Sequence, residues 1–382
     1  MASLRKTVKS ILVVFLRCFS KKRTIVFEST PDFSDNTYAV YTQMVRLGYD
    51  KQYKLVWSCA NKEHLPDDPD GVYYIYPQDK SIKQRLRNAY YLANAKCMIC
   101  CNRFLLPWNS DQVCFYLAHG TPMKSVHDYY TVPASIGYCL SAAEGVEEMT
   151  AYQFNVAREK MFSLGYPRND ILTLSPAPVK EILETPCKKV IVWYPTFRQH
   201  KNGANLASGK ALPIIDDAQA ACALNEYVRK LDVLLVLKPH FAQDLSYMKD
   251  LGLSNIRFID DGFFRENNVT SYGFVAGCDA LLTDYSSIYF DYMLCDKPIG
   301  LVWEDVEQYR QNPGFAVDLE EYGKAGVKIY TLSDFKLFVE QVAENIDACR
   351  EDRRNLCQKV NYASDGENAK RVVAFIVEKA EL

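Results

Sequence analysis

One segment of the chain, ALLTDYSSIYFDYMLCDKP over residues 280–298, combines hydroxyl side chains with a carboxylate at a predicted turn. Residues 280–282 have the apolar character of a buried strand, and the residues from Ser286 onward predict a helix lying against a sheet. The turn between them consists of Thr283, Asp284, Tyr285, Ser286 and Ser287. At such a turn the N–H groups of the first helical turn form an anion site, so a phosphate could bind there. The alternative is that Asp284 or Ser286 only caps the helix.

A second segment, HGTPMK over residues 119–124, follows an apolar run at residues 113–118 that predicts a strand. Its histidine and lysine place an acid/base group and a cation in the crevice where open α/β sheets bind ligands. Gly120 allows the backbone to approach a ligand closely, and Lys124 can neutralise an anion. We therefore interpret His119 as functional rather than as a structural hydrogen-bonding residue.

Further residues at predicted strand ends could contact an anion. Thr196 and Arg198 follow the predicted strand at residues 190–194, and Lys238 and His240 follow the one at residues 233–237. The turn LGYPRND at residues 164–170 either is scaffold or contributes Arg168 to a phosphate, and both interpretations stay open.

The composition bears on the class of protein. The chain has 382 residues and a formal net charge of −2, which suits two domains and gives no reason to expect nucleic acid as a partner. Of its 13 cysteines only three lie close together, at Cys97, Cys100 and Cys101, and no second Cys/His cluster follows them. We predict buried free thiols there, no metal site and no cofactor. Scattered single cysteines also indicate the cytoplasm, where thiols stay reduced.

Residues 1–23 form a basic segment with one apolar helical face and no acidic residue before Glu28. Its apolar run, residues 11–16, is too short to span a bilayer, and no cleavage site follows it. The composition is typical of a helix lying on an anionic membrane surface. We predict peripheral association with the inner face of the cell membrane; the alternative is that the helix packs on the protein's own domain.

Short apolar runs alternate with helical stretches from residue 24 onward, which favours an α/β fold with parallel strands. We predict one such α/β domain over residues 24–178 and a second over residues 179–382, whose last helix could pack back on the first domain. The segment SPAP at residues 175–178 is the predicted linker. Ser141 and Glu144 have the spacing of a capping box at the start of a predicted helix, residues 144–157.

Five motifs resemble, in this order, the CDP-glycerol glycerophosphotransferase family that builds teichoic acids and related surface polymers: HGTPMK, GYPRND, YPTFR, KPH and TDYSSIYFDYMLCDKPI. FES followed by SDN near residue 30 also fits, as does DGENAKRV at the start of the last helix. One departure is EEYGKAG near Tyr322, where the family pattern has Gly-Pro. The resemblance implies a GT-B-like fold, with two Rossmann-like domains facing across a cleft and the donor nucleotide on the C-terminal side.

The resemblance also implies an activity. Glycerol phosphate or another alditol phosphate would pass from a CDP-activated donor to a hydroxyl of a lipid-linked or polymer acceptor, with release of CMP. His119 would be the general base and His240 would contact the donor diphosphate. The predicted donor and phosphate ligands are Lys124, Arg168, Thr196, Arg198, Lys238, Thr283, Asp284, Ser286 and Ser287. Positive side chains and helix dipoles would take the place of a divalent cation. The rival hypotheses are a GT-B glycosyltransferase that uses a nucleotide sugar and a non-catalytic, membrane-associated nucleotide-binding protein.

Overall fold

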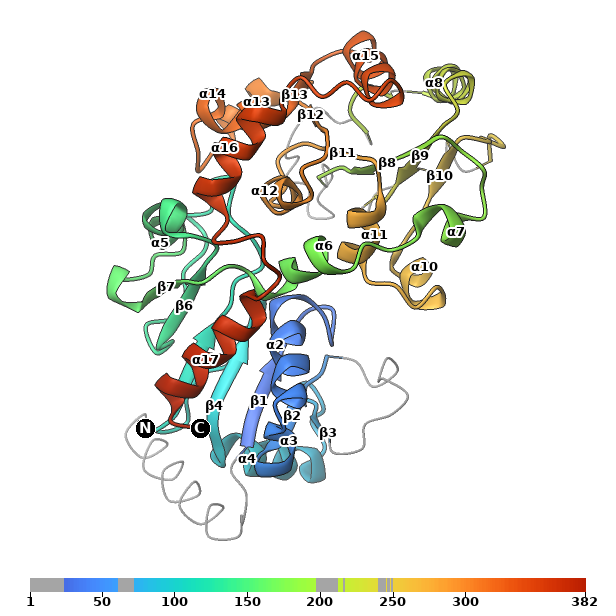
Figure 1. The fold of residues 1–382 in the computed structure, drawn as a ribbon. Helices are drawn as coiled ribbons and strands as arrows, with labels where there is room; N and C mark the ends of the chain where they lie inside the picture. Colours follow the sequence, from blue (N-terminus) through green and yellow to red (C-terminus); the bar gives the residue numbers. More distant parts are fainter. Residues whose placement is uncertain are drawn as a thin grey trace. The chain divides into compact units, whose positions relative to one another are not determined.

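The computed structural model describes residues 24–60, 72–196, 212–215, 217–239, 245, 248 and 250–382 (Figure 1). The chain divides into two compact units. The first contains residues up to Thr121 together with Tyr130–Asp170 and Asp365–Leu382, and the second contains Pro122–Tyr129 and Ile171–Ser364. The division therefore follows Asp170, and the predicted linker at residues 175–178 lies within the second unit.

The first unit is built on a seven-stranded sheet in the order β3-β2-β1-β4-β5-β6-β7. All neighbouring strands in it are parallel. The strands are β1 (Thr24–Glu28), β2 (Lys54–Ser58), β3 (Val72–Ile75), β4 (Ala95–Cys100), β5 (Val113–Tyr116), β6 (Tyr138–Ser141) and β7 (Met161–Ser163). Central strands such as β1 are buried along their whole length, which is expected of a parallel sheet covered on both faces.

The helices of the first unit are α2 (Asp35–Arg46), α3 (Tyr49–Gln52), α4 (Ile82–Ala93), η1 (Glu144–Val146), α5 (Glu147–Gln153), η2 (Arg158–Lys160), η3 (Pro167–Asn169) and α17 (Asn368–Ala380). The last of these, α17, packs on this unit through Phe375, whose ring stacks on Phe162 at 4.2 Å. Its first N–H groups, on Asn368 and Ala369, donate to the Asp170 carboxylate at 2.9 and 2.8 Å. A carboxylate at a helix N-terminus also favours the helix dipole. Asp170 therefore ties the C-terminal helix to the GYPRND turn.

The second unit repeats the architecture with six parallel strands in the order β10-β9-β8-β11-β12-β13. Its strands are β8 (Lys189–Tyr194), β9 (Val233–Leu237), β10 (Ile256–Phe258), β11 (Ala280–Thr283), β12 (Ile299–Val302) and β13 (Val327–Ile329). Its helices are α6 (Asp170–Leu174, which begins at the boundary), α7 (Val179–Leu183), α8 (Ala218–Lys230), α10 (Asp261–Glu266), α11 (Ser271–Gly277), α12 (Ile288–Tyr292), η4 (Met293–Cys295), α13 (Val306–Gln311), α14 (Leu319–Tyr322), η5 (Gly323–Ala325), α15 (Leu332–Ala343) and α16 (Arg350–Val360). The core of this unit packs α8 and α15 on one face of the sheet, around the fully buried Trp193.

Both sheets have the strand order of a doubly wound Rossmann fold, so the predicted α/β class with two Rossmann-like domains is confirmed. In each sheet the order reverses between the first and fourth strands: between β1 and β4 in the first unit, and between β8 and β11 in the second. Ligands of such sheets bind outside the carboxyl ends of the strands at this switch point. The fold thus predicts one functional region for each unit.

The predicted capping box at Ser141 and Glu144 is wrong. Ser141 is the last residue of β6, a buried strand that the sequence pattern did not single out, and its hydroxyl donates to the carbonyl of Ala143 at 3.1 Å. The helical region begins instead with the 3-10 turn η1, whose N-cap residue Ala143 makes no side-chain cap bond. Ser141 therefore belongs to the sheet, although the local pattern assigned it to the start of a helix.

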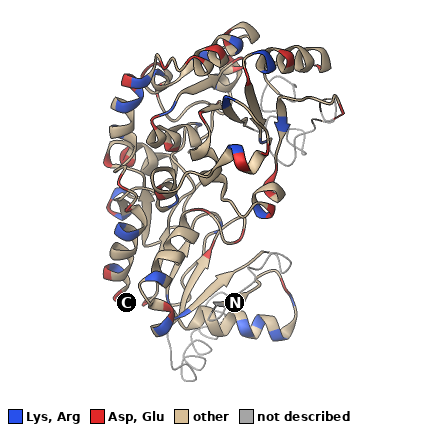
Figure 2. Cartoon of the chain, turned by 45° about the vertical axis from the view of Figure 1, so that its right-hand side comes forward, with Lys and Arg blue, Asp and Glu red and all other residues tan. Residues whose placement is uncertain are grey.

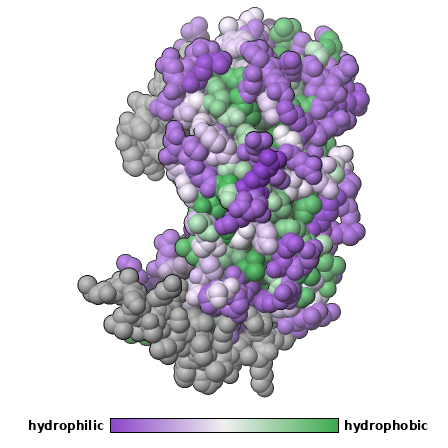
Figure 3. All heavy atoms as spheres, turned by 90° about the vertical axis from the view of Figure 1, so that its left-hand side faces the viewer, coloured by the Kyte–Doolittle hydropathy of each residue, from purple (hydrophilic) through white to green (hydrophobic). Residues whose placement is uncertain are grey.

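On the face drawn in Figure 3, apolar atoms lie in small patches among hydrophilic ones. Among the described helices, none is long and apolar enough to cross a membrane.

Candidate active site

His119 follows strand β5 in the first unit, and the backbone around it is held in an unusual conformation. Ala118 has φ 52° and Gly120 has φ 133°. A positive φ is costly for a residue with a side chain and persists where the surroundings impose it. Here the buried side chain of Asn36, from the first turn of α2, donates from Nδ2 to the carbonyl oxygens of Leu117 and Ala118, both at 3.1 Å. Asn36 therefore fixes the loop that presents His119.

The orientation of the His119 ring follows from its contact with the loop after β4. Nδ1 lies 3.3 Å from the carbonyl oxygen of Cys101, and a carbonyl can only accept a hydrogen bond. In the neutral ring this contact places the proton on Nδ1 and leaves the lone pair on Nε2. The hydroxyl oxygen of Tyr116, 3.4 Å from Nδ1, can accept the same proton. His119 therefore has the tautomer that a general base acting through Nε2 requires.

The protonation of His119 depends on opposing effects. The residue is exposed, yet the protein atoms packed behind its ring desolvate it, and this desolvation is the largest cause of its lowered pKa. The charge of Arg168 also lowers the pKa, whereas the charges of Asp35 and Glu28 and the bond to Cys101 raise it. A lowered pKa keeps the imidazole neutral, and able to accept a proton, at neutral pH.

Arg168 belongs to the same neighbourhood. Its Nη1 donates to Asp35 Oδ1 at 2.8 Å, and its backbone N–H donates to the Asn36 side chain at 3.1 Å. The guanidinium side chain is 9% exposed. These bonds join the GYPRND turn to the start of α2, which is the SDN segment. Arg168 thus serves as scaffold here, and a further contact with phosphate stays a prediction.

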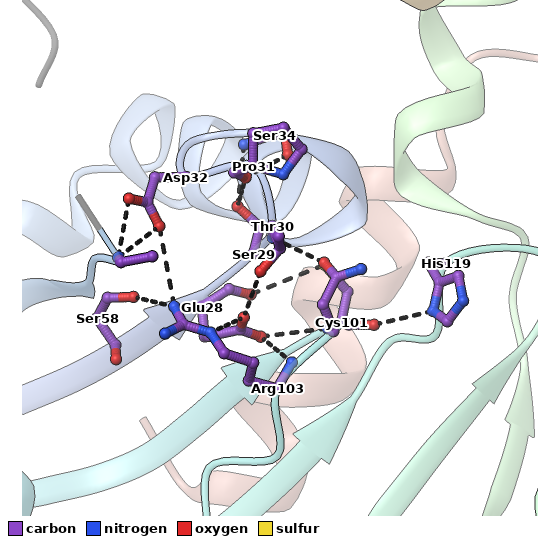
Figure 4. Close-up of polar contacts among 12 residues, drawn as sticks. Glu28, Ser29, Thr30, Pro31, Asp32, Ser34, Ser58, Cys101, Arg103 and His119 are labelled. Carbon is purple, nitrogen blue, oxygen red and sulfur yellow. Dashed lines mark hydrogen bonds and ion pairs between the residues drawn. The ribbon is translucent and has the colours of Figure 1, made fainter. Parts of the chain in front are cut away.

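A buried carboxylate, Glu28, lies at the switch point of the first sheet (Figure 4). Glu28 ends β1 opposite Cys100 of β4. Its Oε2 accepts the backbone N–H groups of Asn102 and Arg103 at 3.2 and 2.9 Å, and its Oε1 accepts the Nε–H of Arg103 at 3.0 Å. Arg103 also donates to the carbonyl of Ser58, at the end of β2. The Glu28–Arg103 ion pair therefore connects the ends of three neighbouring strands, β1, β2 and β4.

The HGTPMK segment is shared between the two units. His119 belongs to the first unit and Lys124 to the second. Within the second unit Lys124 pairs with Phe315 in an antiparallel bridge, and Ser125 donates its N–H to the carbonyl of Gly314 at 3.0 Å. Lys124 is therefore positioned by the segment after α13.

At the switch point of the second unit, the structure brings Thr196 and Asp284 together. Thr283 and Tyr194 are paired at the ends of β11 and β8, and the Thr283 hydroxyl donates to the Tyr194 carbonyl at 3.0 Å. The fully buried Asp284 carboxylate accepts the Thr196 N–H at 2.9 and 3.0 Å, and also the Thr196 hydroxyl. Asp284 thus orients Thr196 across the switch point.

The helix after this turn begins two residues later than its hydroxyl residues suggest. It starts at Ile288, and its N-cap residue, Ser287, makes no side-chain cap bond. The interpretation of Asp284 as a cap is wrong, because its carboxylate reaches Thr196 and the N–H of Tyr285 instead. Ser286 and Ser287 are partly exposed, and their backbone carbonyls accept N–H groups of the following turn. No side-chain hydrogen bond of either serine occurs among the described residues, so both hydroxyls can serve a ligand.

The remaining predicted ligands follow β8 and β9. Lys238 forms an ion pair with Asp261 at 3.1 Å and lies 5.8 Å from the ring centre of Tyr194. Arg198 and His240 lie outside the described residues, so their predicted roles stay predictions.

The three neighbouring cysteines are Cys97 and Cys100 in β4 and Cys101 just after it; each is buried and free. Desolvation raises the pKa of each thiol above its usual value. Among the residues that the structure describes, no group of three His, Cys, Asp or Glu side chains could hold a metal ion.

Sequence reasoning gave no role to Glu28 and Asn36, which lie in the FES and SDN segments, or to Arg103; their contacts join residues far apart in the chain. Glu28 had a local signal, because it is the one charged residue of the otherwise apolar or hydroxyl-bearing strand TIVFE. A carboxylate in a strand that is buried along its length must be paired or hydrogen-bonded. Arg103 offers no comparable signal, since only the fold shows that it faces Glu28.

Comparison with known proteins gives a family match along almost the whole chain. The model of the family described as CDP-glycerol:poly(glycerophosphate) glycerophosphotransferase matches residues 10–378. A teichoic acid poly(glycerol phosphate) polymerase of Bacillus subtilis strain 168 is 28% identical over 349 residues, which cover 83% of this chain and 43% of the polymerase. A teichoic acid glycerol-phosphate primase of the same strain is 23% identical over 303 residues, 74% of each chain. The chain spans about two fifths of the length of the first polymerases it matches.

A solved structure shows the same fold. The wall teichoic acid polymerase TagF superimposes with a TM-score of 0.73 at 22% identity, covering 100% of this chain and 95% of the solved chain. The match to the family model includes every motif on which the resemblance rested. The chain therefore belongs to the CDP-glycerol:poly(glycerophosphate) glycerophosphotransferase family.

Proposed function

We propose that this protein transfers an alditol phosphate, most simply glycerol phosphate, from a CDP-activated donor to an acceptor hydroxyl during the synthesis of teichoic acid, capsule or a related surface polymer. The acceptor oxygen attacks the phosphorus that bears the alditol. The bond from this phosphorus to the oxygen shared with the cytidylyl phosphate breaks, and CMP leaves. The acceptor proton passes to Nε2 of His119. The observation that carries the proposal is the His119 tautomer, fixed by the Cys101 carbonyl, in a chain of this family.

The second unit is assigned the donor. We place the diphosphate against the hydroxyls of Ser286 and Ser287. Thr196 stays a proposed ligand of the same site, and its hydroxyl would have to turn from Asp284 to the diphosphate when the donor binds. Charge developing on the leaving CMP would be stabilised by Lys238, Arg198 and His240. Lys124 and Arg168 complete the proposed cationic set. A TagF variant has been solved after soaking with CDPG, which supports a CDP-activated donor in the family.

We further propose that these cationic side chains do the work of a metal ion and that no cofactor is needed. Turnover should then persist after dialysis against EDTA. Loss of turnover that returns with added Mg²⁺ would contradict this part of the proposal.

The proposed reaction is tested by supplying the protein with CDP-glycerol, CDP-ribitol and a panel of nucleotide sugars, each with a lipid-linked acceptor. Release of CMP and extension of the acceptor by a CDP-alditol is the expected result. Release of a nucleoside diphosphate from a sugar donor would favour a GT-B glycosyltransferase, and absence of any turnover would favour a nucleotide-binding protein.

We also propose that the protein binds the anionic inner face of the cell membrane as a peripheral protein. Residues 1–23, which carry the prediction, lie outside the described residues. Helix α4 adds support, since Ile82 and Leu86, one turn apart, are 77% and 58% exposed. Four exposed cations flank them, drawn blue in Figure 2: Lys80, Lys83, Arg85 and Arg87. An apolar pair among cations suits an anionic bilayer surface.

Vesicle sedimentation tests the membrane proposal. Deleting residues 1–23 should remove most of the binding to anionic vesicles, and Ile82→Ser with Leu86→Ser should weaken what remains. Each basic residue contributes about 1 kcal/mol near such a surface. Turnover on a soluble acceptor analogue should be unchanged. Equal sedimentation of the full-length and altered proteins would contradict the proposal.

A further inference from the structure

A single peptide group, Cys101–Asn102, lies between His119 and the buried Glu28 (Figure 4). Its carbonyl oxygen is 3.3 Å from Nδ1 of His119, and its N–H donates to Oε2 of Glu28 at 3.2 Å. The carboxylate, the peptide and the imidazole therefore form one continuous series of hydrogen bonds. All of its members belong to the first unit.

The side chain of Glu28 is buried and has several hydrogen-bond partners. The residue is 0% exposed, and Oε1 accepts the Nε–H of Arg103 at 3.0 Å and the hydroxyl of Thr30 at 3.3 Å. The guanidinium partner and the several donors compensate for the burial of this carboxylate. The proposed reaction does not use this charge, although it lies one peptide group away from the base.

We propose that Glu28 is a positioning residue for His119 and acts through the Cys101–Asn102 peptide. A carboxylate that accepts the N–H of an amide polarises this amide and makes its carbonyl oxygen a stronger acceptor. The stronger acceptor holds the proton on Nδ1, keeps the lone pair on Nε2 and stabilises the imidazolium that forms when the acceptor proton arrives. The part of this inference that concerns turnover rests on the proposed role of His119 as the base.

Several charged or titratable groups surround His119, and the effect of Glu28 on the His119 pKa can be separated from theirs. Asp35 on α2, Arg168 on η3, Tyr116 on β5 and Glu28 on β1 surround the ring and the peptide. Of these, Glu28 alone is joined to the ring through the Cys101–Asn102 peptide. Its charge and the Cys101 bond both raise the His119 pKa, against the lowering by desolvation.

The experiment measures the pKa and the tautomer of His119 directly, by NMR of protein labelled with ¹³C and ¹⁵N in histidine. The chain has five histidines, and the His119 signals are identified by their loss in His119→Ala. In Glu28→Gln the pKa should fall below that of the wild type, and the population with the proton on Nε2 should rise. Glu28→Asp, which keeps the charge, should lie nearer to the wild type than Glu28→Gln does.

Two further variants separate positioning from a merely structural ion pair. Arg103→Met breaks the pair but keeps the carboxylate, so the His119 pKa should not fall. Glu28→Gln with Arg103→Met removes the partly exposed cation together with the charge it pairs with, and it should reproduce the fall seen in Glu28→Gln. An unchanged His119 pKa and tautomer in this folded double variant would overturn the proposal, as would an equal fall in Arg103→Met.

Turnover supplies an independent readout. Glu28→Gln should lower kcat by roughly tenfold, a part of the 10² to 10⁴ that a general base contributes, with the Kd for CDP unchanged. The NMR comparison needs no substrate. If the protein released no CMP from any CDP-alditol, the proposed function would fail, while the positioning of His119 by Glu28 would still be decided by the titration.

Discussion

In the first sheet a carboxylate at the end of the first strand, Glu28, reaches the loop after the fourth strand, whereas in the second sheet a carboxylate after the fourth strand, Asp284, reaches the loop after the first. Both carboxylates are fully buried and both accept backbone N–H groups across the switch point. The partners differ. Glu28 is neutralised by the guanidinium of Arg103, and Asp284 is satisfied by the hydroxyl and N–H of Thr196 and the N–H of Tyr285.

This difference suits the chemistry that we assign to each unit. The Glu28 carboxylate, one peptide group from His119, favours the imidazolium that forms when the base takes a proton, and Arg103 compensates for the burial of this charge. The Asp284 carboxylate instead accepts hydrogen bonds from Thr196. The serine hydroxyls of the same turn can therefore contact a ligand. The same Rossmann switch point thus supports proton transfer in one unit and anion binding in the other.

The largest effect should separate the two histidines. His119→Ala should cut turnover by roughly 10² to 10⁴ with nearly unchanged affinity for CDP, because a base acts on the acceptor in the transition state. His240→Ala should weaken CDP binding as well as turnover, because it removes a contact made partly in the ground state. Calorimetric titration with CDP and single-turnover rates measure both, with His127→Ala as the control. Loss of donor binding in His119→Ala alone would reverse the assignment of the units.

Double-mutant cycles compare the carboxylates themselves. Thr196→Val combined with Asp284→Ala should show a coupling energy of about 1.5 to 3 kcal/mol in unfolding, as is typical of a hydrogen bond to a buried charge. The matched pair in the first unit is Thr30→Val with Glu28→Gln, whose hydroxyl contact is longer, at 3.3 Å, and should couple less. Equal couplings would mean that the two switch points do not differ in the way described.

Asn36→Ala should destabilise the first unit by about 1 to 3 kcal/mol, since it leaves the carbonyls of Leu117 and Ala118 without their donor. Urea unfolding measures this loss. Thr42→Ala is the control on the same helix, because its hydroxyl donates to the carbonyl of Ala39, a local contact within α2. A cost for Asn36→Ala no greater than for Thr42→Ala would show that the His119 loop does not depend on Asn36.

The smallest effect on stability is expected at the serines. Ser286→Ala with Ser287→Ala should leave the melting temperature nearly unchanged, because neither hydroxyl caps α12. Affinity for CDP should fall about tenfold, which corresponds to roughly 1.4 kcal/mol. Differential scanning fluorimetry beside calorimetry distinguishes the two quantities. A lower melting temperature with intact CDP affinity would restore a structural role for the pair.

The strand ends were the part of the site that local pattern could predict. Apolar runs such as VLLVL predict buried parallel strands. A His or a cluster of hydroxyl residues directly after such a run lies at the carboxyl edge of the sheet, where ligands bind. The pattern was insufficient where a long-range contact decides: it offered Asp284 as a phosphate ligand or a helix cap, whereas the loop after the neighbouring strand supplies Thr196 as its partner. It also missed β6 and β7, which are short strands defined by their neighbours in the sheet.

The pH dependence of a single turnover, with donor saturating, tests most directly the claim that His119 is the base. Desolvation lowers its pKa, and only the neutral imidazole accepts a proton, so the rate should rise with pH through a pKa below that of a free histidine and then stay level. In His119→Ala this rise should disappear together with most of the rate. The same acid limb in His119→Ala, at an undiminished rate, would contradict the account.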